Sequence, residues 1–280
     1  MGALAARGAT PRIGPFSGSL GAYAALATAG FRRYATYRQA TAAGLFTNSV
    51  FGFMRCYALL AVVGAAGPVA GYTGPRLMTY VWLGQAMLAV VNIWGAPDLQ
   101  DRIRTGDVVI DLLRPVNPVW QYLAGDLGRA AYAVLIRATV PLLIGALAFD
   151  LYAPRHLVTY PLFALSLLLA VVIGFGCRYL VHATAFWLLD ARGPHLAWVI
   201  VAGVLSGLYF PLWFLPEVVV RILVYATPLP SLLQTPTDVA VERADPLPLI
   251  GAQVGWAVMV LAAAQYVQRR AERRMVVQGG

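Results

Sequence analysis

The sequence predicts an all-α integral membrane protein with six transmembrane helices. Hydrophobic residues make up 60% of the 280 residues and charged residues only 12%, whereas a soluble globular domain carries about 25% charged residues. Several apolar runs reach the roughly 20 residues that a helix needs to cross a bilayer, and none shows the alternating pattern of outer-membrane strands. The six expected spans cover approximately residues 44–64, 77–94, 130–149, 157–177, 196–210 and 247–267.

Residues 1–43 precede the six-span domain, which we expect to occupy residues 44–280 as one unit. The first 19 residues are rich in glycine, alanine, proline and serine, a composition that is typical of disorder. Residues 20–43 combine arginines with alanines and aromatic residues, so they are predicted to form an amphipathic helix on the membrane surface. The arginines of this interfacial helix are Arg32, Arg33 and Arg38.

A charged elbow, residues 98–126, separates the second span from the third. Its mixture of charged and apolar residues predicts short amphipathic helices at the membrane surface. Gly106 is placed to end the first helix, because glycine readily adopts the left-handed conformation after a helix. The Arg-Pro pair at 114–115 should end the second, and the Asn-Pro pair at 117–118 should start the third. A compact elbow suits the docking of a soluble partner; the alternative is an ordinary solvated loop.

The stretch 211–245, before the last span, is apolar but interrupted by prolines. Irregular backbone at membrane depth persists only where protein buries it or where it lines a cavity. Two short re-entrant helices, at about 216–225 and 229–233, would satisfy this limit. We therefore expect a re-entrant helical hairpin before span six. The alternative is an interfacial loop covered by aromatic residues.

The distribution of arginine orients the predicted spans. All 21 Lys+Arg residues are arginine. With the N-terminus placed in the cytosol, fifteen of them fall on the cytosolic side and four fall outside: Arg76, Arg155, Arg221 and Arg243. This bias agrees with the positive-inside rule and predicts six spans with both termini in the cytosol.

Three polar residues in the apolar regions are candidates for a translocation path or gate: Asn48, Arg55 and Glu217. A charge at the centre of a span costs roughly 2.5–3.5 kcal/mol on insertion scales and usually faces a protein interior or a cavity. Arg55 therefore lines a substrate path or pairs with an acid; alternatively, it bonds backbone carbonyls or snorkels. Asn48 lies on the same helix face as Arg55. Glu217 either stabilises the start of a re-entrant helix or contacts an outer gate.

Several chemistries find no support in the sequence. The phosphate-binding motif G-x-x-x-x-G-K-[ST] requires lysine, which the chain lacks. The three histidines fall in separate segments, so no metal site is expected, and Cys56 and Cys177 stand alone in apolar runs as small hydrophobic residues. No motif indicates a hydrolase. The net charge of +9 comes from dispersed arginines, which argues against nucleic-acid binding.

Motifs in the elbow and in the chain from residue 205 onward recur in one known family. In the elbow they are Ile103, Gly106, Asp107, Leu112, Arg114 and Pro115. Further along they are Leu205-Ser206-Gly207, Pro211-Leu212, Phe214-Leu215-Pro216, Gln253, Trp256 and the tail 276–280. From about residue 30 onward, the chain resembles the membrane subunit of bacterial ABC-2 type exporters.

The resemblance implies a permease that pairs with a second permease, identical or a paralogue, and with two cytosolic ABC ATPase subunits. It implies that this chain is not an enzyme and binds no cofactor, because ATP and Mg bind to the partner ATPase. The implied setting is the bacterial inner (cytoplasmic) membrane, among its lipids. In that family the elbow is the coupling helix that contacts the ATPase. The implied coupling residues are Asp98, Asp101, Arg102, Ile103, Arg104, Gly106, Asp107, Ile110, Leu112, Leu113, Arg114 and Pro115.

We therefore expect an ATP-driven exporter of a hydrophobic or amphiphilic substrate, such as a drug, a lipid or a secondary metabolite. The alternative is a secondary transporter or channel that works without an ATPase. Against that alternative, the sequence shows no broken helices repeated in two matching halves. It also shows no chain of intramembrane acids that could relay protons.

Overall fold

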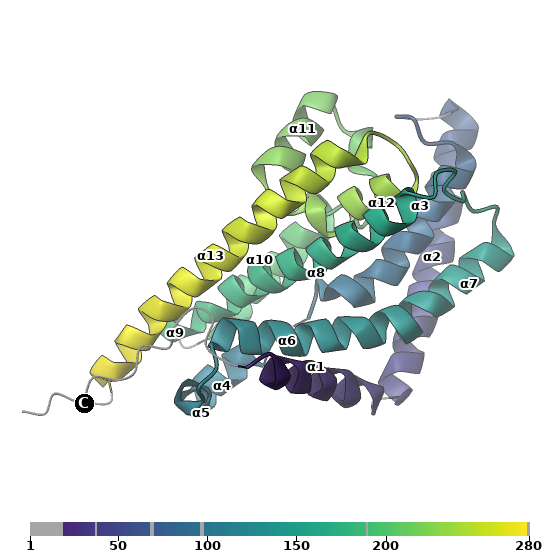
Figure 1. Cartoon of the computed structure of the whole chain (residues 1–280). Helices are drawn as coiled ribbons and strands as arrows, with labels where there is room; N and C mark the ends of the chain where they lie inside the picture. Colours follow the sequence, from purple (N-terminus) through teal and green to yellow (C-terminus); the bar gives the residue numbers. More distant parts are fainter. Residues whose placement is uncertain (1–18, 37, 68–69, 96–97, 189, 279–280) are drawn as a thin grey trace, which may run out of the picture.

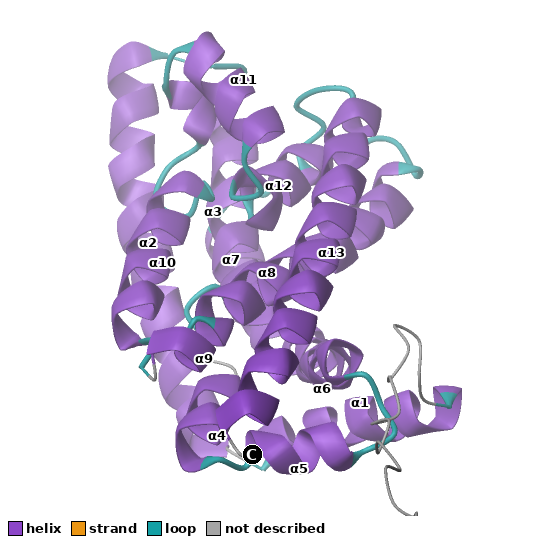
Figure 2. Ribbon diagram, turned by 90° about the vertical axis from the view of Figure 1, so that its left-hand side faces the viewer, coloured by secondary structure: helices purple, strands orange, loops and turns teal. Residues whose placement is uncertain are grey.

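The computed structural model describes residues 19–278, apart from 37, 68–69, 96–97 and 189. All regular elements in these residues are helical, and no strand occurs among them (Figure 2). Within the same residues, four helices are long and apolar enough to cross a membrane: Thr41–Ala65, Pro118–Ala148, Thr159–Leu188 and Pro246–Arg273. The chain is therefore an all-α multi-pass membrane protein. The tail expected to be disordered lies outside the described residues, except for Ser19.

The helices occur in the following order. They are α1 (Leu20–Ala35), α2 (Arg38–Ala66), α3 (Gly74–Met87), the π-helix η1 (Leu88–Asn92), α4 (Leu99–Thr105), α5 (Val108–Leu113), α6 (Pro118–Tyr132), the π-helix η2 (Ala133–Ala138), α7 (Thr139–Ala148), α8 (Thr159–Ala183), α9 (Ala185–Leu188), α10 (Arg192–Leu205), the 3₁₀ turn η3 (Leu212–Phe214), α11 (Glu217–Ala226), the 3₁₀ turn η4 (Pro230–Leu232), α12 (Gln234–Ala240) and α13 (Pro246–Gln278).

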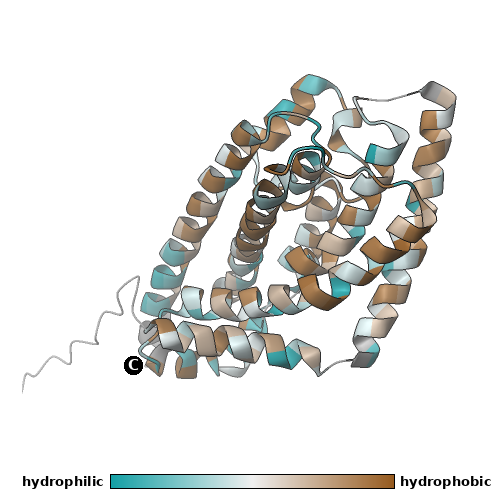
Figure 3. Ribbon diagram, turned by 45° about the vertical axis from the view of Figure 1, so that its right-hand side comes forward, coloured by the Kyte–Doolittle hydropathy of each residue, from teal (hydrophilic) through white to brown (hydrophobic). Residues whose placement is uncertain are grey.

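The bundle has two distinct ends. Figure 1 places α1, α4, α5 and the last turns of α13 at one end, called the elbow end, and α11 and α12 at the opposite end, called the far end. Figure 3 shows hydrophobic residues along the middle of the long helices and hydrophilic residues toward the C-terminal end of α13. This distribution suits helices whose middles face an apolar medium and whose ends face water.

Three expected boundaries differ in the structure. The interfacial helix expected at 20–43 is divided, because α1 ends at Ala35 and α2 begins at Arg38, so the expected domain boundary at 43/44 falls inside α2. Where a fifth span is expected at 196–210, the structure has the shorter apolar helix α10, and Gly207 just beyond it has φ of 84°. That left-handed conformation is incompatible with continuing an α-helix.

The stretch before α13 forms short helices, as the prolines suggest. The first, expected at 216–225, is α11 at Glu217–Ala226. In place of the second, expected at 229–233, the chain makes the turn Pro230–Leu232 and then the helix Gln234–Ala240. Proline at the start of this turn is favourable, because its missing N–H needs no partner there.

Close backbone contacts hold α1 against α6. A Cβ added to Gly30 would lie 2.2 Å from the carbonyl oxygen of Gly125, and one added to Gly128 would lie 1.8 Å from that of Ala27. Only glycine fits at these two positions without moving a backbone. Helix α1 is therefore packed closely against α6, the elbow-end half of the long helix Pro118–Ala148.

A hydrogen-bonded carboxylate closes the far end. Glu242 accepts hydrogen bonds from the hydroxyls of Tyr152 and Thr159, both at 2.6 Å. It also accepts from the backbone N–H groups of Arg155 at 3.1 Å and His156 at 2.9 Å. These bonds join the turn after α12 to the loop between α7 and α8. Desolvation raises the pKa of this carboxyl, but the hydrogen bonds outweigh it and hold the pKa well below its usual value.

We expect Glu242→Gln to lower the thermal midpoint at neutral pH and to flatten its dependence on pH. A carboxylate with a depressed pKa gives stability that is complete above its unfolded pKa and is lost as pH falls through its folded pKa. The wild-type midpoint should therefore fall as the pH drops below about 4.5. Scanning fluorimetry measures this fall, and Asp150→Asn, at an exposed acid of the same end, is the control. Identical pH profiles for Glu242→Gln and the wild type would contradict the assignment.

Candidate functional site

The elbow has the local structure that its sequence predicts. Gly106 ends α4 with φ of 83°. Arg114 ends α5 with extended backbone, as the following proline requires. Asn117 caps α6, because its side-chain oxygen accepts hydrogen bonds from the backbone N–H groups of Val119 and Trp120 at 3.0 and 3.3 Å. These three points fix where each elbow helix ends or begins.

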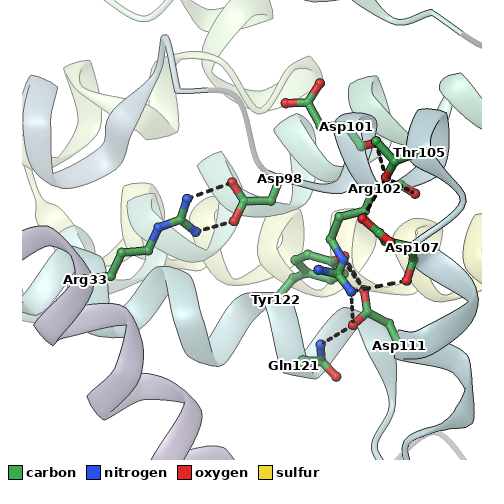
Figure 4. Close-up of polar contacts among 9 residues, drawn as sticks. All are labelled: Arg33, Asp98, Asp101, Arg102, Thr105, Asp107, Asp111, Gln121 and Tyr122. Atoms are coloured by element: carbon green, nitrogen blue, oxygen red, sulfur yellow. Dashed lines mark hydrogen bonds and ion pairs between the residues drawn. The ribbon is translucent and has the colours of Figure 1, made fainter.

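The carboxylate of Asp111 joins α4 and α5 to α6 (Figure 4). Asp111 is 1% exposed. Arg102 of α4 donates to both its oxygens, from Nε at 2.6 Å and from Nη2 at 2.9 Å. From α6, Gln121 Nε2 donates at 3.2 Å and the hydroxyl of Tyr122 at 2.8 Å. Charge-assisted and bidentate hydrogen bonds are among the strongest in proteins, so this carboxylate ties α4 and α5 to α6.

The other face of α5 exposes apolar side chains. Val109 and Ile110 are about half exposed, and Leu113 is 80% exposed. Val108, in contrast, is buried in the core with Leu99. Val109 and Leu113 are four residues apart and therefore share a helix face. A group of exposed apolar side chains with a charged surround is typical of an interaction site. We call Val109, Ile110 and Leu113 the α5 patch.

Charged and polar residues flank α5 in the sequence. Asp101 and Arg104 form an exposed pair at 3.7 Å. Asp107 accepts from the Thr105 hydroxyl at 2.9 Å. The other exposed coupling candidates of the elbow are Asp98, Gly106, Arg114 and Pro115. Asp98 is paired with Arg33 of α1.

Three expected coupling residues differ from that arrangement. Arg102 points inward to Asp111. Ile103 is half-buried and packs against the core beneath the elbow. The side chain of Leu112 lies outside the described part of the structure.

The three candidates for a path or gate make separate contacts. The Arg55 guanidinium donates to the Leu208 carbonyl at 2.6 Å and lies 5.4 Å from the ring centroid of Tyr209. It therefore joins α2 to the chain just after α10. Asn48 is half-buried on α2. Glu217 is exposed in the first turn of α11 and pairs with Arg221 at 2.6 Å.

A buried charge cluster at the elbow end has no counterpart in the sequence-based predictions. Arg129 donates to the carbonyls of Ala89 and Val90, both at 2.8 Å. Arg178 donates to the carbonyls of Val91 and Asn92, the latter at 2.8 Å. These four carbonyls belong to η1, which directly follows α3. The two guanidinium groups therefore cap that helix with side-chain donors.

Asp126 balances the two arginines. Its Oδ1 accepts from Arg129 Nε at 2.7 Å, and its Oδ2 accepts from Arg178 Nη2 at 2.9 Å. Both arginines are buried. The sequence carries one signal of this cluster, the acid–base pair at i and i+3 in the last turns of α6. Arg178 follows 52 residues after Asp126, so no local spacing relates them.

A known protein family matches most of the chain. A family model described as ABC-2 family transporter protein matches residues 50–279. The matched range includes the whole elbow, the buried charge cluster and nearly all of the bundle. No curated protein and no solved structure matches the chain significantly.

We expect Asp126→Asn to destabilise the protein strongly. Removing one partner of a buried ion pair leaves an uncompensated charge and costs about 3–5 kcal/mol, and here two buried arginines would lose their counter-charge. Chemical or thermal unfolding in detergent measures the loss. Asp101→Asn, which breaks the exposed pair with Arg104, should have little effect. Equal stability of the two variants would show that the cluster contributes little.

Proposed function

Because this chain belongs to the ABC-2 transporter family as a permease subunit, we propose that it serves an ATP-driven exporter. The proposed substrate is hydrophobic or amphiphilic, such as a drug, a lipid or a secondary metabolite, which leaves the cytosol. We propose two cytosolic ABC ATPase subunits as partners, which would bind ATP and Mg, and a second permease, identical or a paralogue. The proposed location is the bacterial inner membrane, with both termini in the cytosol.

The α5 patch supports this proposal most directly. It presents Leu113 at 80% exposure on a helix whose opposite face is held by a buried carboxylate. Buried apolar anchors supply most of the affinity of an interface, whereas charged rims steer the partner and set its orientation. An ATPase that encloses the α5 patch would therefore grip a rigid element. Asp98, Asp101, Arg104, Asp107 and Arg114 would form the rim, with Gly106 and Pro115 shaping the ends of α5.

The connections of the elbow give a route for movement into the membrane. Asp111 holds the elbow to Gln121 and Tyr122 of α6. Asn117, at the start of α6, exchanges two hydrogen bonds with Gln265 of α13, both at 3.0 Å. A displacement of the elbow would thus be transmitted to two long helices. Arg102 and Ile103 act inside this linkage rather than at the partner surface.

We further propose six membrane spans: α2, α3 with η1, α6 to α7, α8, α10 and α13. In this arrangement the elbow end faces the cytosol and α11 with α12 forms the outer re-entrant hairpin. Asn48, Arg55 and Glu217 are the proposed path or gate residues. Arg55 is the strongest of these, because it contacts the break that follows α10, where a moving hairpin would hinge.

Cysteine labelling tests the six-span arrangement. Single cysteines at the exposed positions Gly71 and Asp245 should react with an impermeant maleimide in intact cells. A cysteine at Thr105 should react only after lysis. The native Cys56 and Cys177 are buried, and their alanine variants provide the background. Labelling of Thr105→Cys from outside would refute the proposed orientation.

We expect Leu113→Asp to release the ATPase, because it places an unpaired charge in the apolar contact. The loss of one apolar anchor at an interface typically costs about 2 kcal/mol or more, so co-purification of the ATPase should fall by more than tenfold. The measurement is the ratio of the two subunits after affinity purification of this chain. Leu20→Asp, at another exposed leucine of the elbow end, is the matched control. Full retention of the ATPase by Leu113→Asp, with full transport, would mean that the elbow is an ordinary loop.

A further inference from the structure

A cavity of about 190 Å³ lies at the elbow end, between α1, α6, the end of η1 and α8. Its walls include Leu26, Gly30 and Tyr34 from α1 and Gly125 from α6, together with Phe175 from α8. A single water needs only about 10–15 Å³ of such space. The cavity is therefore large enough for a chemical group of several heavy atoms.

The charges around this cavity are unequal. Its walls carry three arginines and two aspartates: Arg33, Arg129, Arg178, Asp98 and Asp126. Arg33 is paired with Asp98. The other two arginines are buried and share one carboxylate, that of Asp126, so one positive charge is in excess. An excess buried positive charge is unfavourable unless a counter-charge approaches it. The cavity therefore favours an anion, and guanidinium groups match the geometry of phosphate oxygens.

A second observation concerns Gln121, which lines the cavity and is only 8% exposed. Its Nε2 donates to the carboxylate of Asp111 at 3.2 Å. Because an ionised carboxylate only accepts hydrogen bonds, this contact fixes which way the amide is turned. The opposite atom, Oε1, is buried and has no hydrogen-bond partner. Buried polar atoms are rarely left unpaired, so an occupant that reaches this oxygen could supply the missing donor.

We propose that the cavity binds a phosphate ester that also carries a hydroxyl group, supplied by the headgroup of an anionic phospholipid such as phosphatidylglycerol. The phosphate would face the arginines, and the hydroxyl would donate to Gln121 Oε1. The position fits a lipid source, because α1 is an amphipathic helix packed beside a membrane-crossing helix. Basic pockets between membrane helices are known to hold anionic headgroups.

The bound headgroup would contact the side chains that hold Asp111 and so keep α5 in place. Gln121 and Tyr122 line the cavity, and the same two side chains hold Asp111. A headgroup bonded to Gln121 would limit the motion of this amide. The elbow would then be held most firmly when the lipid is present.

Gly125 offers a steric test that removes no polar group. It lines the cavity, and a Cβ added to it would have no atom within 4 Å. Gly125→Leu should therefore fill the cavity while leaving the arginines and Gln121 in place. Gly255→Leu is the matched control, since it adds the same side chain to a helical glycine of α13 that also has open space. Leucine is a better helix former than glycine at both positions.

The experiment uses the full chain, purified in mild detergent and in nanodiscs. Phosphatidylglycerol should co-purify with the wild type and should raise its thermal midpoint more than phosphatidylcholine does. Phosphatidylcholine lacks both a net negative charge and a hydroxyl donor. Lipid mass spectrometry should find about tenfold less phosphatidylglycerol on Gly125→Leu than on Gly255→Leu, equivalent to about 1.4 kcal/mol of binding free energy.

A third addition, soluble sn-glycerol 3-phosphate, separates the two possible sources of the phosphate ester. A lipid site requires that this compound raise the midpoint much less than phosphatidylglycerol does. If it gives the same rise, the site takes a free phosphate ester and the lipid source is wrong. If neither compound raises the wild-type midpoint above the phosphatidylcholine value, the proposal is wrong altogether. Equal phosphatidylglycerol on Gly125→Leu and Gly255→Leu would refute this location, and the wild-type comparison decides the proposal even if Gly125→Leu does not fold.

Discussion

The last turn of a membrane helix exposes carbonyl groups that have no partner within the helix, and this constraint shapes the elbow end. In an apolar environment such groups need donors from the protein itself. Here Arg129 and Arg178 supply the donors for η1, and Asp126 offsets their charge. The cluster therefore fixes α6 and α8 beside η1. Because α1 packs on α6 and Asp111 is bonded to α6, α1, α4 and α5 take their positions from the same cluster.

The far end uses a related device with different chemistry. Asp238 is buried and accepts hydrogen bonds from the Tyr72 hydroxyl at 2.5 Å, the Gln234 amide at 2.9 Å and the Trp213 indole at 2.7 Å. Glu242 makes a comparable set of bonds nearby. Each end of the bundle is therefore held by carboxylates that accept several donors from separate segments of the chain. Such polar connections specify one arrangement of helices, whereas apolar side chains alone allow sliding.

The ends and starts of the elbow helices could be predicted from the sequence, because Gly106, the Arg-Pro pair and the Asn-Pro pair act through their own backbone angles. The all-α membrane class could be predicted from composition, because apolar content and the length of apolar runs do not depend on how the helices pack. The partners of Arg178 could not be predicted, since it meets Asp126 only through the packing of α6 on α8. Which face of α5 is buried could not be predicted from the sequence either. A six-residue helix has too few turns to show which side is buried, so Val109 was missed and Asp111 was not recognised as an anchor.

The exposure of the α5 patch also has a consequence for the production of this subunit. Three apolar side chains on a rigid helix cost free energy whenever water covers them. A copy that has not met its partner would display them permanently, and two such copies could associate through the same surface. Under the proposed function, balanced synthesis of the permease and its ATPase would therefore protect the chain from aggregation. The surface proposed for assembly would then also make overproduction of this subunit alone unfavourable.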